Sequence, residues 1–254
     1  MTFAAVQAQR LGIDAGVVTV AEPSLDLPNL LDGIAIAGRD DGVTQFENVY
    51  IDGRRVQYVR AQAEPLTLDD IPAGWRKAPV ALVGPVCGET PPDLAAALAC
   101  GLVGVSAQGW LREVGPEGRV RKVAWRGEPF WRGAHLVVAS DEDVEPDPSQ
   151  VDRWAAEAPI VALTLARRGV RVHTGGVWLQ MPAYARDEVD PTGAGDVFAA
   201  AFLIRYHETS DVREAMRFAS AAASLAVGAP GIEGIGGREE IEAVMRAHPE
   251  VDVA

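Results

Sequence analysis

Residues 190–196 read Asp-Pro-Thr-Gly-Ala-Gly-Asp and combine the residue types needed for an anion site and for a base. Gly193, Ala194 and Gly195 have small or no side chains, so their backbone N–H groups can approach a charged ligand closely. An alanine-rich apolar helix follows, and the free N–H groups and dipole at a helix start attract phosphate. Asp196 falls in the first turn, where a carboxylate either stabilises the helix start or accepts a proton from a bound substrate. The spacing alone leaves both roles open.

The longer run 190–202 (DPTGAGDVFAAAF) resembles the C-terminal signature of the ribokinase-like (PfkB) carbohydrate kinases. The resemblance implies that the amides at 193–195 form an anion hole for the transferred phosphate and that Thr192 contacts the nucleotide. It also implies that Asp196 deprotonates the acceptor hydroxyl. The expected activity is phosphorylation of a hydroxyl of a small sugar or polyol, with ATP and Mg²⁺.

Two other interpretations stay open. One is a catalytically impaired nucleotide-binding relative that acts as a regulatory or structural subunit, and the other is an inositol- or nucleoside-specific kinase. In the family, a first strand and a di-glycine turn hold the sugar and precede a helix like the one expected over residues 2–12, but the sequence has neither. Two explanations stay open: a misassigned start, or an N-terminally shortened form with weakened acceptor binding. The intact Asp196 favours catalysis.

Apolar runs alternate with helical patterns along most of the chain, which indicates a parallel sheet with right-handed crossovers. The expected strands cover residues 15–20, 80–83, 102–105, 135–139, 160–165, 170–173 and 176–179. The expected helices cover residues 2–12, 92–99, 149–157, 197–205, 212–227 and 239–247. We predict one α/β domain over residues 1–254, and the resemblance implies a ribokinase-like three-layer αβα fold.

The segment 34–66 differs from this pattern. Residues 46–51 and 55–60 predict two strands, and Asp52-Gly53 is typical of a hairpin turn between them. An edge hairpin is one interpretation. The resemblance implies the other, a β-lid at 34–66 that covers the sugar and can mediate a homodimer.

Two segments are candidates for the nucleotide side. Residues 164–170 (TLARRGV) resemble the family's T-x-G-x-x-G loop, with Ala166 in place of the first glycine. The resemblance implies cofactor-binding roles for Thr164, Arg167 and Gly169, although an ordinary β-turn explains the same residues. Gly228 follows a helix of small residues that resembles the family's adenine-side helix and loop.

The metal and acceptor candidates lie after two other strands. Ser140 to Asp143 occupies the place of the family's N-x-x-E motif, so Asp143 is expected to organise Mg²⁺, most simply through water. An N-capped acidic turn is the alternative. Gln108 and Arg112 occupy the place of a sugar-binding segment, and they are weak substrate candidates.

Composition excludes several classes of protein. The 254 residues carry a net charge of −13, which argues against non-specific nucleic-acid binding. Cys87 and Cys100 lack metal-site spacing and fit a reducing compartment. No apolar run reaches the ~18 residues of a membrane span, and no signal peptide is evident. We expect a cytoplasmic protein without membrane or nucleic-acid partners.

Overall fold

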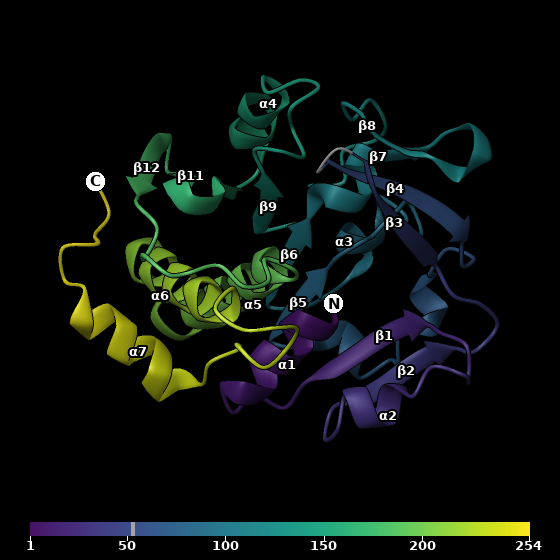
Figure 1. The fold of residues 1–254 in the computed structure, drawn as a ribbon, viewed down its shortest axis with the longest axis horizontal. Coiled ribbons are helices and arrows are strands. Elements are labelled where there is room, and N and C mark those ends of the chain that lie inside the picture. Colours follow the sequence, from purple (N-terminus) through teal and green to yellow (C-terminus); the bar gives the residue numbers. More distant parts are fainter. Residues whose placement is uncertain (52–53) are drawn as a thin grey trace.

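A six-stranded mixed sheet forms the centre of the molecule in the computed structural model, which describes residues 1–51 and 54–254 (Figure 1). Its strands, in spatial order, are β12 (Val177–Met181), β11 (Val170–Thr174), β10 (Ile160–Thr164), β9 (Leu136–Ser140), β6 (Leu102–Ser106) and β5 (Val80–Val83). Strands β5, β6, β9 and β10 are parallel, whereas β11 and β12 add an antiparallel hairpin. The mainly parallel sheet is confirmed.

Helices cover both faces of this sheet. One face carries α1 (Thr2–Arg10), α5 (Ala194–Thr209) and α6 (Val212–Ala226), with α7 (Arg238–Ala247) packed outside α6. The other face carries α3 (Leu94–Ala97) and α4 (Gln150–Glu157). Short 3-10 helices are η1 (Leu68–Asp70), η2 (Trp75–Lys77), η3 (Ala107–Leu111), η4 (Pro116–Gly118) and η5 (Ala166–Arg168). The three-layer αβα architecture is therefore confirmed.

Strand β9 shows why the sequence produces two cores. Leu136 and Val138 belong to the core beneath α5 and α6, whereas Val137 and Ala139 belong to the core beneath α4. Successive side chains of a strand point to opposite faces, so a continuous apolar run is buried on both sides. Within residues 1–51 and 54–254, no helix has the length and apolar character to cross a membrane.

Two further strand pairs occupy the N-terminal quarter of the chain. β1 (Gly16–Val20) pairs in parallel with β2 (Ala35–Arg39), and α2 (Leu27–Leu30) lies in the connection between them. β3 (Gln45–Ile51) and β4 (Arg54–Ala61) form the expected antiparallel hairpin. The predicted turn at Asp52-Gly53 lies outside the described residues. Strands β2, β3 and β4 lie within the segment 34–66, for which a lid was predicted.

A second hairpin, which the sequence pattern did not reveal, follows η3. It consists of β7 (Arg112–Val114) and β8 (Val120–Lys122), and an isolated bridge between Tyr58 and Arg119 joins it to β4. Strands of three residues are too short to show a clear alternation of apolar and polar side chains.

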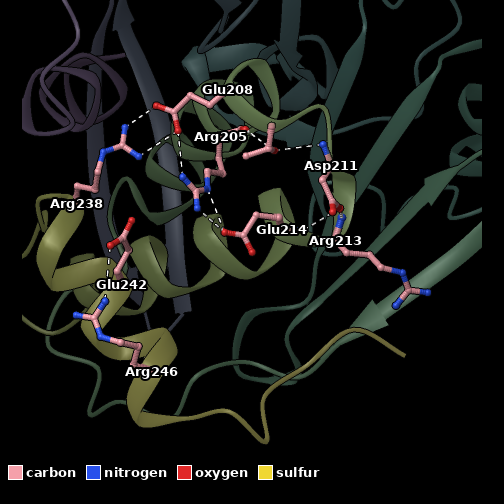
Figure 2. Close-up of polar contacts among 9 residues, drawn as sticks. Arg205, Glu208, Asp211, Arg213, Glu214, Arg238, Glu242 and Arg246 are labelled. Atoms are coloured by element: carbon pink, nitrogen blue, oxygen red, sulfur yellow. Dashed lines mark hydrogen bonds and ion pairs between the residues drawn. The ribbon is translucent and has the colours of Figure 1, made fainter.

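Ion pairs join α5, α6 and α7 on the side away from the sheet (Figure 2). Arg205 contacts Glu214 at 2.5 Å and Glu208 at 3.3 Å, and Arg238 also contacts Glu208 at 2.5 Å. Both guanidinium groups lie over the ring of Phe218. This cluster holds three helices together and thereby supports α5, whose first turn carries the candidate base.

Candidate active site at the start of α5

The first turn of α5 begins at Gly193, which is its N-cap residue and has a φ of 78°. Glycine adopts this left-handed conformation without steric cost. The N–H of Ala194 donates to Pro191 O at 3.3 Å. Among the described residues, the N–H groups of Gly193, Gly195 and Asp196 have no hydrogen-bond acceptor. Three free donors at a helix start can bind an anion, the role predicted for this turn, although the Ala194 N–H already has an acceptor.

Asp196 lies in the same turn, and its side chain is 27% exposed. Its Oδ2 atom lies 3.2 Å from the N-terminal ammonium of Met1. The Met1 side chain reaches Gly84, the residue after β5, where its methyl group would clash with any added Cβ. The candidate base and the free amides therefore lie near the carboxyl end of β5, and this edge is where open α/β sheets bind their ligands.

Asp143 and Gln108 meet at the same edge of the sheet. Gln108 donates to Asp143 Oδ1 at 3.2 Å, and Asp143 Oδ2 accepts from the N–H and hydroxyl of Ser140 at 3.1 and 2.6 Å. Asp141 N–H donates to Thr164 O at 3.0 Å, which links this turn to the end of β10. The structure thus brings together three of the predicted site residues: Gln108 in η3, Asp143 just after β9, and Thr164 at the end of β10.

The contacts of the Asp143 carboxylate determine whether it could bind Mg²⁺ directly or through water. Its side chain is buried, with both oxygens already bonded to protein donors. Among the residues that the structure describes, no group of three or more His, Cys, Asp or Glu side chains could hold a metal ion. Mg²⁺ commonly retains several waters and binds through substrate phosphates with few protein ligands. Asp143 therefore fits an indirect role through water, and not direct ligation within a protein cage.

In the loop from Thr164 to Gly169, the positions of both motif glycines have a positive φ, although the first of them is Ala166. Ala166 adopts a φ of 50° and Gly169 a φ of 96°. A Cβ on Gly169 would lie 2.0 Å from Met181 O, so only glycine fits there. The exposed Arg167 pairs with Glu188 at 3.4 Å. The alanine substitution therefore keeps the loop conformation at the cost of backbone strain.

Arg112, the other acceptor candidate, is the first residue of β7 and follows η3 directly. It donates to Val86 O at 3.2 Å and lines a surface cavity with Trp110, Trp125 and neighbouring prolines. The lining of this cavity contains no residue of α5. Of the two predicted acceptor residues, Gln108 therefore contacts the metal candidate, and Arg112 lines a cavity that Gly109, the neighbour of Gln108, also lines.

Sequence reasoning missed two residues next to the predicted cofactor positions. The carboxylate of Asp190 accepts from Thr192 N–H at 2.9 Å and from Gly231 N–H at 3.0 Å. Hydrogen bonding from Thr192, and then from Gly231, lowers the pKa of Asp190. The stem of Arg186 lies across Gly228, where a Cβ would be 3.3 Å from its Cδ. An Asp two residues before Thr192 is a sequence signal for such a turn.

Residues 131–234 match the sequence model of the pfkB family carbohydrate kinases. This segment includes Asp143, the loop at 164–169 and the whole first turn of α5. The chain is ribokinase-like in fold, and its residues 131–234 resemble the pfkB family carbohydrate kinases in sequence.

Similar proteins agree with this assignment. A ribokinase of Bacillus subtilis is 39% identical over 84 residues, which cover 33% of this chain and 29% of that protein. The chain matches less than a third of the length of this and the other curated relatives found first. Among solved structures, a pyrophosphate-dependent kinase of the ribokinase family superimposes with a TM-score of 0.78 at 23% identity, covering 95% of this chain and 90% of that one.

A second solved structure extends the comparison. Arabidopsis thaliana ribokinase complexed with ribose and ATP has a TM-score of 0.75 at 19% identity, covering 96% of this chain and 86% of that chain. At these identities the superpositions show the fold alone. The likeness to the pfkB family therefore rests on the sequence match over residues 131–234, and the ribokinase-like architecture rests on the superpositions.

Proposed function

We propose that this chain is an ATP-dependent phosphotransferase that phosphorylates a hydroxyl of a small sugar or polyol. One observation carries the proposal: the N–H groups of Gly193, Gly195 and Asp196 are free of protein acceptors in the same helical turn as the Asp196 carboxylate. An anion site and a base within the same helical turn suit the transfer of a phosphoryl group to a hydroxyl.

Each group then has a defined role. Asp196 accepts the proton of the attacking hydroxyl, and the free amides stabilise negative charge on the transferred phosphoryl group. Thr164, Arg167, Gly169, Thr192 and Gly228 hold the donor, and the exposed Arg167 is able to contact its phosphates. When bound, Mg²⁺ neutralises charge on the donor phosphates, with Asp143 as an indirect partner through water. Catalysis then rests mainly on positioning and electrostatics.

The acceptor would enter beneath the β3–β4 hairpin, which we propose as the lid of a single domain and as a surface for homodimer formation. Gln108 is the better acceptor candidate because it lies in the same cluster as Asp143. Arg112 would contact an acceptor that enters the cavity it lines. We propose a cytoplasmic location and no nucleic-acid partner, because the net charge of −13 repels polyanions.

The position of Arg186 favours inorganic pyrophosphate as an alternative phosphoryl donor to ATP. Its aliphatic stem covers Gly228, on the small-residue surface proposed for adenine. Among the described residues, its guanidinium has no hydrogen bond or ion pair. If the adenine surface is covered and the Arg186 guanidinium lies beside it, the site suits a donor that is recognised through its phosphates alone. Several solved structures that this chain resembles are pyrophosphate-dependent kinases of the ribokinase family.

A matrix of donors and acceptors tests the proposal. ATP and pyrophosphate, each with Mg²⁺, are incubated with ribose, fructose, myo-inositol and nucleosides, and phosphorylated products are measured by mass spectrometry. A phosphorylated sugar or polyol formed with either donor supports the proposed transferase. The donor that gives the faster reaction shows whether the enzyme depends on ATP or on pyrophosphate. ATP binding without product from any acceptor would favour the regulatory alternative instead.

A further inference from the structure

A cavity of about 430 Å³ lies at the amino ends of β9 and β10. Its walls come from the residues just before β9 and from the link between α4 and β10, and they include Trp131, Arg132, Ala134, His135, Glu157 and Pro159. Strand β9 runs from this cavity toward Ser140, so the cavity lies at the opposite edge of the sheet from Asp143. Its volume falls within the range of about 300–1,000 Å³ that is typical of small-molecule sites.

Two opposite charges line this cavity without pairing with each other. Glu157 Oε2 accepts the indole N–H of Trp131 at 2.7 Å. Within residues 1–51 and 54–254, the Arg132 guanidinium has no hydrogen bond or ion pair, and Glu157 pairs with no cation. Glu157 is also the last residue of α4, and the carboxyl end of a helix attracts cations. The cavity therefore offers a separate partner for a bound anion and for a bound cation.

The polar and aromatic walls of the cavity are held in place by the protein. His135 Nδ1 accepts the Val103 N–H at 3.1 Å, so the proton of the neutral ring is on Nε2, which can donate to an anion. The main chain of His135 also accepts from Ile160 N–H at 3.1 Å. The ring of Trp131 packs edge-on against Phe130, with centroids 5.1 Å apart. A ligand would thus meet a preformed donor and a preformed aromatic wall.

We propose that this cavity binds a zwitterionic amino acid with an aromatic side chain. The carboxylate of the ligand pairs with Arg132 and accepts from His135, whereas its ammonium group pairs with Glu157. Its ring packs against Trp131 and Pro159. This ligand is neither phosphoryl donor nor acceptor, so the site goes beyond the proposed function and does not depend on it.

Four probes separate the parts of the ligand. L-Phenylalanine carries both charges and a ring, 3-phenylpropanoate lacks the ammonium group, 2-phenylethylamine lacks the carboxylate, and glycine lacks the ring. Calorimetry on the full chain should show the tightest binding for phenylalanine. Each of the other three should bind about fivefold more weakly or worse, because each loses one contact of a partly exposed site.

Two substitutions test which charge meets which group. Arg132→Gln should weaken phenylalanine and 3-phenylpropanoate about fivefold and leave 2-phenylethylamine within twofold of wild type. Glu157→Gln should weaken phenylalanine and 2-phenylethylamine instead, and leave 3-phenylpropanoate within twofold. The matched controls are Arg126→Gln and Glu128→Gln, because both residues are exposed, lie between β8 and β9, and do not line the cavity. They should keep every affinity within twofold.

Binding of phenylalanine is then repeated with saturating ATP and in the Asp196→Asn variant, and we expect the same affinity in both. The inference is overturned by absence of binding at millimolar phenylalanine, by equal affinity for all four probes, or by displacement of phenylalanine by ATP. Loss of the crossed pattern between Arg132→Gln and Glu157→Gln, or equal losses in the control variants, would also overturn it. A chain that phosphorylates no acceptor refutes the proposed function but leaves each of these binding measurements decisive.

Discussion

The ring of Phe3 covers the face of Gly193 on which any larger residue would place its side chain. A Cβ built on Gly193 would lie only 2.1 Å from Phe3 Cγ. Helix α1 therefore packs directly against the turn that presents the free amides, and residues far apart in the sequence shape one site. Gly195, two positions later, faces open space, with no atom within 4 Å of an added Cβ.

This contrast predicts different effects for two glycine substitutions. Gly193→Ala should destabilise the fold by at least about 2 kcal/mol, because a left-handed φ and a clash with Phe3 combine. Gly195→Ala should leave stability unchanged or raise it by a few tenths of a kcal/mol. Its methyl group should nevertheless weaken donor binding, since it stands where phosphate must approach. Urea unfolding and donor calorimetry on both variants check this, and equal stability of the two variants would refute the role given to Phe3.

The left-handed conformation of Ala166 leads to a second prediction. Ala166→Gly should stabilise the protein by roughly 0.5–1 kcal/mol, because relief of backbone strain exceeds the extra entropy of the unfolded chain. Ala155→Gly, within α4, is the control and should cost about 1 kcal/mol. Thermal and urea unfolding measure both changes. A loss of stability in the Ala166 variant would show that the loop is not strained.

Sequence patterns predicted the sheet well because its strands are buried on both faces and read as continuous apolar runs, as in residues 136–139. They also located Asp196 and the glycine turn, since these lie within one short segment. The hairpin β7–β8 was missed because its strands have three residues each. The Asp190–Gly231 link was missed because it joins positions 41 residues apart, and no local periodicity reports such a contact.

The ion pairs of Glu208 predict a pH dependence of stability. Burial alone would raise the pKa of Glu208, but Arg238 and then Arg205 hold it below its usual range. A lowered folded-state pKa means that this stabilisation is present above the ordinary glutamate pKa of about 4.3 and is lost as the pH falls through the folded-state pKa. Glu208→Gln should therefore cost about 0.5–1 kcal/mol at pH 7, and the difference from wild type should shrink below pH ~4.

Urea unfolding of wild type and Glu208→Gln at pH 7 and in acid measures this difference. Glu242→Gln is a suitable control, because Glu242 pairs with Arg246 one turn away at 3.6 Å on the same helix, α7 (Figure 2). Its effect should stay below about 0.5 kcal/mol at either pH. A difference for Glu208→Gln that is constant with pH would contradict the proposed contribution of the ion pairs.

The most direct test of the whole account compares Asp196→Asn with Asp152→Asn. Asp152 occupies the same first-turn position in α4, on the other face of the sheet, so both variants lose an equivalent carboxylate at a helix start. With the best donor and acceptor, the account predicts that Asp196→Asn lowers kcat by about 10²–10⁴-fold while donor affinity changes little. Asp152→Asn should keep wild-type turnover. An Asp196→Asn variant that retains more than half of the wild-type kcat would contradict the assignment of Asp196 as the base.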